Sequence, residues 1–371
     1  MERPKVDSNA WIERLALRQF RNYEGLELEL SSGFHILSGA NAQGKTNLLE
    51  ALYLAGSTRL LRGMRDTEAI MEGRESAQVT IQLAHTQTTI SVVLDRSARK
   101  KVLVNSASLP RASDVLGRLP CVCVSSVDLP IVSGEPSDRR LFLDLELSQL
   151  YPAYLRHLSV YKRALEHRNA LLRAAQDTTV ADEQFEPWEE QIAVHGADIR
   201  STRNHFLSNL NPYSQKAHKQ IGSGETIQLC SQPRDEAETA NDLRELLSNS
   251  RRKDVARGST TAGPHRDDFR IDVNGRDARL YGSQGQQRTA MLSIKLGTME
   301  LEQGERGKPP LLLLDDILSD LDERRRAMLM DWVMEHGGQT ILTCTEPAIA
   351  GVAIVSQSRV LHVSNGEISE E

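Results

Sequence analysis

The sequence comprises 371 residues, of which 39% are hydrophobic and 26% are charged, and its formal net charge at neutral pH is −6. These proportions are typical of a globular protein of about two domains. No apolar run reaches the roughly 18 residues of a membrane-spanning helix, so no membrane contact is expected. The negative net charge excludes a uniformly basic nucleic-acid binder, so any DNA contact has to come from local basic patches.

The first residues are polar and lack the apolar segment of a secretion signal. We therefore expect residues 1–11 to form a loose N-terminal extension and the protein to be cytoplasmic. The cysteines agree with a reducing compartment. Cys121 and Cys123 alternate within an apolar segment, and no second Cys/His pair stands at the spacing of a zinc site, so we interpret them as buried thiols.

Short apolar segments predict strands in the first third of the chain, over residues 12–17, 26–30, 34–37, 79–83, 90–94 and 101–105. Asn105 and Ser106 predict a turn at the end of the last segment. Long helical patterns then dominate residues 136–254, including a helix over 188–210 that we expect to end near Asn211 and Pro212. After Gly263 the α/β pattern resumes, with elements expected over residues 269–273, 284–303, 311–314, 323–334, 340–343 and 359–363. Asn274 and Gly275 directly follow the first of these segments and predict a β-hairpin. The sequence thus predicts an α/β domain of residues 12–135 and 255–371, interrupted by a helical lobe at 136–254.

A GxxxxGKT phosphate loop follows the apolar segment 34–37 and precedes a segment with helical spacing. Gly39 and Gly44 allow the backbone to curl so that its N–H groups point at phosphate oxygens. Lys45 would reach the β- and γ-phosphates, and the Thr46 hydroxyl would bind Mg²⁺. This pattern predicts an ATP-binding site made by Gly39, Ala40, Asn41, Ala42, Gln43, Gly44, Lys45, Thr46 and Asn47.

Two carboxylates follow the apolar segment 311–314, which is typical of a buried parallel strand. Open α/β sheets bind ligands at this end of their strands. We predict that Asp315 holds Mg²⁺ through water and that Asp316, together with Lys45, is catalytic, with Asp316 positioning the attacking water. The alternative for a strand-end aspartate is to cap the next helix, and that alternative suits Asp320 or Asp322 better than Asp315.

The segment Ser283, Gln284, Gly285 and Gln286 lies about 30 residues before Asp315 and opens a helix, where its N–H groups could meet an anion. It resembles the signature motif of ABC-type ATPases. In that family the signature acts in trans, on the nucleotide of the partner head. Residues 319–322, with Asp320 and Asp322, resemble the D-loop of the same family. The resemblance implies an ABC-type ATPase head, an α/β fold with a mixed sheet.

Several further stretches resemble the RecF family of bacterial DNA repair ATPases, which are related to the heads of SMC proteins; they are residues 17–23, 39–47, 134–144 and 263–268. The resemblance implies a slow, DNA-dependent ATPase that dimerises on ATP and binds double-stranded and gapped DNA. Hydrolysis would release the dimer, and RecO- and RecR-like partners would help it load a recombinase at single-strand gaps. The lobe at 136–254 is too short for the long coiled coil of SMC proteins, as the resemblance requires.

Three positions depart from what these families carry. ABC ATPases usually have Glu where this chain has Asp316, which predicts slow turnover. Residues 343–346 lack the switch histidine of many ABC ATPases, and residues 57–66 differ from the RecF pattern although they stay basic. His265, between Pro264 and Arg266, is interpreted as structural or as facing DNA.

Clusters of basic residues are the candidates for DNA phosphate contacts, and they include Arg59, Arg62, Arg65, Lys100 and Lys101. The alternative is that each cluster is an ordinary solvated face. Two other functions also stay open. One is an ABC or SMC-like ATPase of another system, and the other is a nucleotide-gated DNA clamp in which hydrolysis is vestigial.

Overall fold

The computed structural model describes residues 11–61, 65–222 and 224–370. Two compact units make up the described chain. The first is drawn from residues 1–129, 213–225 and 291–371, and the second from residues 130–212 and 226–290. The predicted extension at 1–11 therefore lies almost wholly outside the described residues, since the first strand begins at Ile12.

An antiparallel sheet forms one half of the first unit. Its order is β2-β1-β4-β5-β6-β7, and its strands are β1 (Ile12–Phe20), β2 (Tyr23–Glu29), β4 (Ser76–Leu83), β5 (Thr89–Asp95), β6 (Lys101–Val104) and β7 (Ala107–Ser108). Buried and partly exposed residues alternate along β4 and β5, because one face of this sheet packs on the core. The predicted turn at Asn105 is confirmed, since Asn105 and Ser106 both have positive φ.

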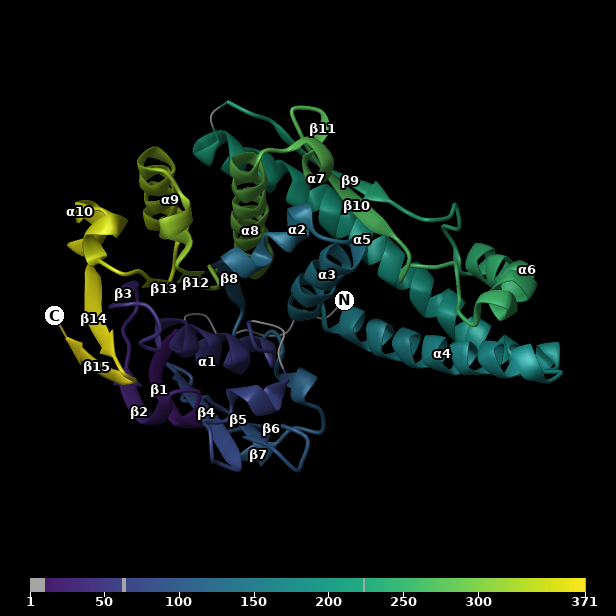
Figure 1. Cartoon of the computed structure of the whole chain (residues 1–371), viewed down its shortest axis with the longest axis horizontal. Helices are drawn as coiled ribbons and strands as arrows, with labels where there is room; N and C mark the ends of the chain where they lie inside the picture. Colours follow the sequence, from purple (N-terminus) through teal and green to yellow (C-terminus); the bar gives the residue numbers. More distant parts are fainter. Residues whose placement is uncertain (1–10, 62–64, 223, 371) are drawn as a thin grey trace. The chain divides into compact units, whose positions relative to one another are not determined.

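A largely parallel sheet forms the other half, in the order β15-β14-β3-β13-β12-β8. Its strands are β3 (Phe34–Ser38), β8 (Cys121–Ser125), β12 (Leu311–Asp315), β13 (Thr340–Thr343), β14 (Ser358–Ser364) and the antiparallel β15 (Glu367–Glu370). Helix α1 (Lys45–Ser57) lies between the two sheets and contacts strands of both (Figure 1). Its residues Leu48, Leu49 and Leu52 are fully buried. These residues place the start of α1 at the carboxyl ends of the parallel strands.

The other α-helices in the described residues are α2 (Pro130–Ser133), α3 (Pro136–Leu150), α4 (Pro152–Asp177), α5 (Glu186–Ile221), α6 (Ala240–Arg257), α7 (Ala278–Tyr281), α8 (Gln284–Arg306), α9 (Glu323–His336) and α10 (Val352–Val355). None of the helices in the described part of the chain is both long and apolar enough to span a bilayer.

All four cysteines carry free thiols, and Cys121, Cys123 and Cys344 are buried. Burial also raises the pKa of the Cys123 thiol, which keeps this cysteine protonated and unreactive.

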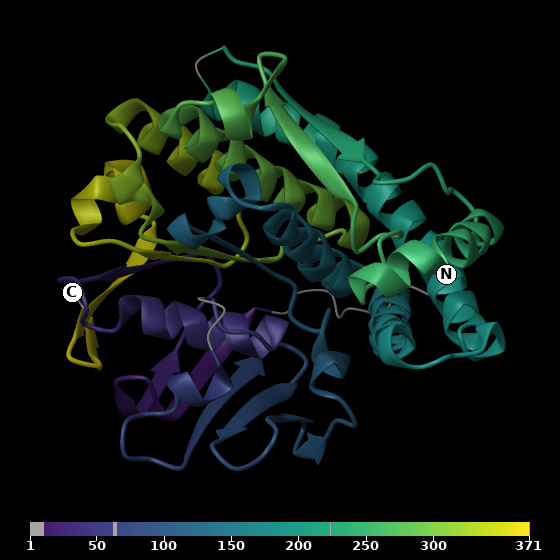
Figure 2. The same ribbon diagram turned by 45° about the vertical axis from the view of Figure 1, so that its right-hand side comes forward.

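The second unit combines α-helices with a three-stranded sheet, β11-β10-β9, made of β9 (Ile227–Gln232), β10 (Asp268–Val273) and β11 (Arg276–Asp277). The predicted hairpin is confirmed, since Asn274 and Gly275 both have positive φ between β10 and β11. Strand β9 runs along α5 (Figure 2), where the N–H of Leu229 donates to Oδ1 of Asn211 at 3.1 Å.

The two compact units divide the chain at other positions than the bounds predicted for the inserted lobe. Residues 255–290 belong to the same unit as most of the expected lobe, whereas residues 213–225 belong to the unit with the two large sheets. The lobe is also not purely helical, because β9 within it pairs with β10. The pairing joins residues from 36 (Gln232 and Asp268) to 46 (Ile227 and Val273) positions apart, and a single sequence carries no signal of that register.

The predicted end of a helix near Pro212 is wrong, because α5 continues through Pro212 to Ile221. Proline removes one backbone donor, but packing of the following turns compensates for it. His218 contacts the Ser293 hydroxyl at 2.9 Å, and Lys216 pairs with Glu300 at 2.8 Å, so the last turns of α5 are held on α8. Tertiary contacts therefore override the local preference.

A buried arginine connects three helices of the second unit. Arg168 on α4 is fully buried. It pairs with Asp254 on α6 at 2.7 Å and with Glu189 on α5 at 3.1 Å. It also donates to the Thr260 hydroxyl and the Leu247 carbonyl, so its guanidinium group is almost completely bonded.

Arg168→Ala should destabilise this unit strongly, because Asp254 and Glu189 would stay buried without their shared cation. We expect a loss of about 3–5 kcal/mol in the free energy of unfolding measured by urea denaturation. Arg163→Ala, at an exposed position of the same helix, is the control and should change that free energy by less than about 0.5 kcal/mol. Equal losses in the two variants would contradict a structural role for the buried cluster.

Candidate functional site

The predicted phosphate loop joins β3 to α1, as the motif requires. Gly39 and Gly44 both have positive φ, at 136° and 118°. A Cβ atom on Gly39 would lie 2.4 Å from the carbonyl oxygen of Val363, and one on Gly44 would lie 2.7 Å from Nδ2 of Asn22. Glycine is thus required at both positions by backbone conformation and by close approach.

A second layer of polar side chains holds the loop in place. Asn22, in the turn between β1 and β2, donates to the Gln43 carbonyl at 3.0 Å and accepts from Asn47 at 2.8 Å. The Tyr23 hydroxyl donates to the Gly44 carbonyl at 3.1 Å, and burial raises the pKa of this phenol. From the sequence, residues 17–23 stand out only by their resemblance to the RecF family, which gives Asn22 and Tyr23 no role. The signal in the sequence for this role is the pair of adjacent polar residues, Asn22 and Tyr23, at a short turn.

The other support of the loop comes from the end of the chain. Oε1 of Gln43 accepts from the N–H of Asn365 at 2.8 Å, and the Gln43 carbonyl accepts from the N–H of Gly366 at 3.1 Å. Both donors lie in the tight turn between β14 and β15. The loop is therefore clamped by turns that stand more than 300 residues apart in the sequence.

Lys45 begins α1 and turns back onto the loop. Its ammonium group donates to the carbonyl oxygens of Gly39 at 2.6 Å and Ala40 at 2.7 Å. The side chain is nearly buried, so these contacts hold the cation within the curl of the loop. An anion entering the loop would meet this charge together with the positive end of α1.

The structure brings Thr46 and Asp315 together. The Thr46 hydroxyl donates to Oδ1 of Asp315 at 2.8 Å, and the Thr343 hydroxyl donates to the same oxygen at 3.0 Å. The contact exists because β12, β13 and β3 are parallel neighbours that end at the same edge of the sheet. Hydroxyl and carboxylate oxygens are the donors that Mg²⁺ takes in phosphate sites, so these residues fit that ion.

Asp316 lies directly beyond the strand end and is exposed. Its backbone is left-handed, with φ of 50°, a conformation that aspartate tolerates better than most residues. Its N–H donates to the Thr343 hydroxyl at 2.9 Å, and its Oδ1 accepts from the Ser319 hydroxyl at 2.6 Å. The Asp316 carboxylate is therefore fixed by a residue of the predicted D-loop.

The remaining D-loop aspartates differ in role. Asp322 caps α9, since its carboxylate accepts from the N–H of Arg325 at 2.9 Å. This is the capping role that the sequence left open for Asp320 or Asp322. Asp320 lies in the short 3₁₀ turn Ile317–Asp320 instead.

The predicted signature residues lie in the second unit, at the start of α8. Ser283 and Gln286 form a reciprocal cap: Gln286 Oε1 accepts from the Ser283 N–H at 2.8 Å, and the Ser283 hydroxyl accepts from the Gln286 N–H at 3.2 Å. Gln284 is exposed and Gly285 is partly exposed. The arrangement presents a polar helix start with one face open to solvent.

The basic candidates fall into different environments. Arg59, Arg65 and Lys101 are exposed, whereas Lys100 donates to the Thr58 carbonyl at 2.6 Å and pairs with Asp66 at 3.1 Å. Arg62 lies outside the described residues. An internal ion pair of this kind satisfies Lys100 and makes it the weakest of the candidates.

His265 is a structural residue. Its Nε2 faces the Thr260 carbonyl at 3.1 Å and therefore donates, which leaves Nδ1 to accept from the Tyr161 hydroxyl. Burial lowers the pKa of His265 to about 4, so the ring is neutral at neutral pH. A neutral, fully bonded imidazole does not suit a DNA phosphate contact.

The two stretches that resemble the RecF family at residues 134–144 and 263–268 are structural as well. Arg139 forms a double contact with Asp268 at 2.7 and 2.8 Å, and Arg200 forms another with Asp267 at 2.7 and 2.8 Å. Arg140 donates to the Asp267 carbonyl at 2.9 Å. Residues 134–144 and 263–268 are thus the two sides of one ionic network inside the second unit.

A hollow of about 530 Å³ opens beside the phosphate loop. Its lining includes Arg21, Asn22 and Asn47, which border the loop, and Thr67, Glu68, Ile70, Glu72 and Arg96. Arg21 is fixed there by Glu50 on α1, at 2.7 Å, and by the Glu68 carbonyl. The volume of this hollow falls in the range of small-molecule binding sites.

Comparison with known proteins gives one consistent result. The family model described as RecF/RecN/SMC N terminal domain matches residues 11–369. A protein of Clostridium novyi (strain NT) named DNA replication and repair protein RecF is 37% identical over 97% of this chain and 100% of its own length. The protein of that name from Clostridium perfringens (strain 13 / Type A) is 35% identical, over 96% of this chain and 99% of its own.

Solved structures agree. A structure described as the recombination mediator protein RecF-ATP in the RecFOR pathway matches with a TM-score of 0.90 and 29% identity, covering 100% of both chains. The Smc head domain of Pyrococcus furiosus, with an extended coiled coil and bound to the C-terminal domain of ScpA, matches with a TM-score of 0.57 and 16% identity, over 98% of this chain and 96% of that one. The second likeness concerns the fold alone, and it confirms the predicted ABC/SMC-type head.

Proposed function

Because this chain belongs to the RecF family, we propose that it is an ATP- and Mg²⁺-binding ATPase of DNA replication and repair whose ATP-bound dimer holds duplex or gapped DNA. The observation that carries the proposal is the 2.8 Å contact between Thr46 and Asp315, which unites the phosphate loop with the strand-end carboxylate. Two sequence motifs 269 residues apart meet there. The ATP named for the solved RecF structure supports the same ligand here.

The triphosphate would lie along residues 39–47, with its charge met by the loop N–H groups, the start of α1 and Lys45. Lys45 would exchange its contacts with the Gly39 and Ala40 carbonyls for phosphate oxygens. The hollow beside Asn22 and Asn47 would take the nucleoside. Thr46 and Asp315 would hold Mg²⁺, Asp315 through water, and this ion supplies charge neutralisation at the β- and γ-phosphates.

Hydrolysis would depend on Asp316. Its carboxylate, oriented by the Ser319 hydroxyl, would position a water for attack on the γ-phosphate. An aspartate reaches one methylene less far than glutamate and is solvent-exposed here, which supports slow turnover. With slow hydrolysis, ATP binding would assemble the complex with DNA, and the hydrolysis rate would set how long that complex lasts.

Completion of each site would come from a second copy of the chain. Ser283, Gln284, Gly285 and Gln286 would meet the γ-phosphate of the partner's nucleotide from the start of α8. The exposed polar surface of this helix start supports that role. Asp320 and Asp322, near the catalytic edge, would contribute to the same dimer contact as the D-loop.

DNA binding would be electrostatic and independent of sequence. Arg59, Arg65 and Lys101 are exposed and suit phosphate contacts, and pairing of two copies would concentrate positive charge in a protein whose net charge is −6. The solved relative is named as a recombination mediator of the RecFOR pathway. By the same reasoning RecO- and RecR-like proteins would be the partners of this chain at gaps.

Tight binding of fluorescent duplex DNA should require ATP and Mg²⁺, and the affinity should fall steeply as salt is raised. Lys45→Met should lower ATP affinity by about ten- to a hundredfold and abolish the ATP-dependent DNA binding, since it removes a charged phosphate contact. Fluorescence anisotropy measures both. Lys219→Met, at an exposed position of α5, is the control and should behave as the unchanged protein. If DNA affinity were the same with and without ATP, the proposal that ATP controls DNA binding would be wrong.

Ser283→Arg should leave ATP affinity unchanged but prevent ATP-dependent dimerisation, because the large cation would occupy the place of the partner's γ-phosphate. Light scattering with and without ATP measures the dimer. Ser201→Arg, at an exposed position of α5, carries the same change in charge and size and should still dimerise. A dimer formed equally by both variants would contradict the trans role of the signature.

Asp316→Asn should lower the ATP hydrolysis rate by about 10²–10⁴-fold while ATP-dependent DNA binding persists. Release of DNA should then become slow, which stopped-flow fluorescence measures. Asp331→Asn, on the exposed face of α9, should leave both rates unchanged. If hydrolysis and release in Asp316→Asn match the unchanged protein, Asp316 is not the water-positioning residue and the chain acts as a clamp with vestigial hydrolysis.

A further inference from the structure

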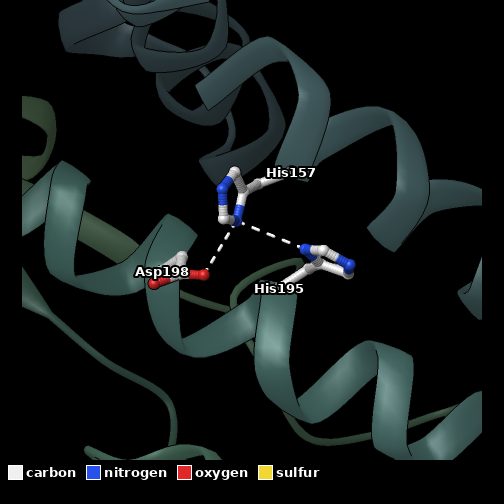
Figure 3. A group of neighbouring side chains, drawn as sticks. All are labelled: His157, His195 and Asp198. Carbon is white, nitrogen blue, oxygen red and sulfur yellow. Dashed lines mark hydrogen bonds and ion pairs between the residues drawn. The ribbon is translucent and has the colours of Figure 1, made fainter. Parts of the chain in front are cut away.

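Three side chains of metal-ligating type converge between α4 and α5 in the second unit (Figure 3). His157 comes from α4, and His195 and Asp198 come from α5, one helical turn apart. Nδ1 of His157 lies 2.8 Å from Oδ2 of Asp198 and 3.3 Å from Nδ1 of His195. All three ligand atoms lie within 4.8 Å of one another.

Hydrogen bonding alone does not satisfy this arrangement. A neutral imidazole carries one proton, so Nδ1 of His157 either donates or accepts. If Nδ1 of His157 carries the proton and donates it to Asp198, it makes only a poor contact with Nδ1 of His195. If Nδ1 of His195 carries the proton and donates it to His157, the lone pair of His157 faces the Asp198 carboxylate. A single cation among the three atoms would accept electron pairs from all of them.

The distances fit such an ion. Tetrahedral Zn²⁺ with bonds of about 2.0–2.1 Å places neighbouring ligand atoms about 3.3 Å apart. The two nitrogen atoms already stand at 3.3 Å, and the Asp198 oxygen would move outward by a few tenths of an ångström. Asp198 is about half exposed and both histidines are partly buried, so the carboxylate has room to move.

The surrounding helices hold the ligands in place. Ten residues further along α4, His167 stacks on Trp188 of α5 with ring centroids 4.2 Å apart. The buried pair of Arg168 and Glu189 follows immediately.

We propose that His157, His195 and Asp198 bind one divalent first-row transition-metal ion and thereby join α4 to α5. Two imidazoles with one carboxylate suit Zn²⁺, Ni²⁺ or Co²⁺, whereas Mg²⁺ and Ca²⁺ take all-oxygen sites. Three protein ligands leave one tetrahedral position for water. The site shares no residue with the nucleotide-binding edge, so it does not depend on the proposed function.

Zn²⁺ titrated into the full-length, nucleotide-free protein tests the site by calorimetry. Saturating Mg²⁺ is present throughout, so that Thr46 and Asp315 do not take up Zn²⁺. We expect one Zn²⁺ per chain and a loss of affinity of at least about tenfold in His195→Ala. His205→Ala, at an exposed histidine of the same helix, is the matched control and should keep the affinity. Asp198→Asn, a milder change, should also weaken binding if His195→Ala disturbs folding.

Two further readouts distinguish this site from the thiols. Zn²⁺ should raise the melting temperature of the unchanged protein and of His205→Ala, but not that of His195→Ala. Bound Co²⁺ should give a visible spectrum of nitrogen and oxygen ligands without thiolate charge-transfer bands. Equal Zn²⁺ affinity in His195→Ala, thiolate bands, or the absence of one-to-one binding would each overturn the proposal.

Discussion

The hydrogen bond from Thr46 to Asp315 depends on the burial of α1. This helix is enclosed by two sheets, and its apolar residues are buried on every side, so its first turn has a single position relative to the carboxyl ends of the parallel strands. β12 ends at the same edge because its register with β13 pairs Asp315 with Thr343. A hydroxyl and a carboxylate from distant segments then meet at bonding distance. Lys45, Asp316 and Ser319 follow the carboxyl ends of β3 and β12 at the same edge of this sheet.

The loop itself is clamped from outside the motif. Asn22 and Tyr23 hold the backbone carbonyls of Gln43 and Gly44, and the hairpin of Asn365 and Gly366 holds Gln43. A curl of backbone with positive φ at Gly39 and Gly44 would be mobile in a free peptide. These contacts preorganise it, so that an arriving anion does not have to order the loop. The motif thus works as part of a larger polar framework.

The second unit is held by arginines that lie in its interior. Arg139, Arg168, Arg200 and Arg203 each bond to at least one aspartate in this unit. Fully bonded guanidinium groups avoid the large penalty of an unpaired buried charge, and their fixed geometry specifies how helices and strands meet. This gives the charged residues of 134–144 and 263–268 a structural role. Their charges face one another, and His265 is a neutral member of the same interior.

Sequence reasoning predicted the elements of the two large sheets well, because alternating or continuous apolar residues mark strands directly, as in β4, β5 and β12. It failed at Pro212 and at β9. At Pro212, contacts of the following turns with α8 outweigh the missing donor. At β9, Ile227 and Leu229 alternate with polar residues as in a strand, but the partner β10 lies far along the chain, so the pairing is not visible locally. The division into units also depends on packing, since residues 213–225 belong to the unit that their side chains contact.

By itself the sequence determined the phosphate loop, the strand-end carboxylates and the order of the motifs, because each is a local pattern of residue types imposed by backbone geometry. Only the tertiary structure decided that Asn22, Tyr23 and Asn365 support the loop, that Lys100 is paired and that His265 is buried. It also decided that His157 meets His195 and Asp198. The physical reason is the same in each case. Contacts between distant segments depend on how apolar faces pack, and no single segment encodes that packing.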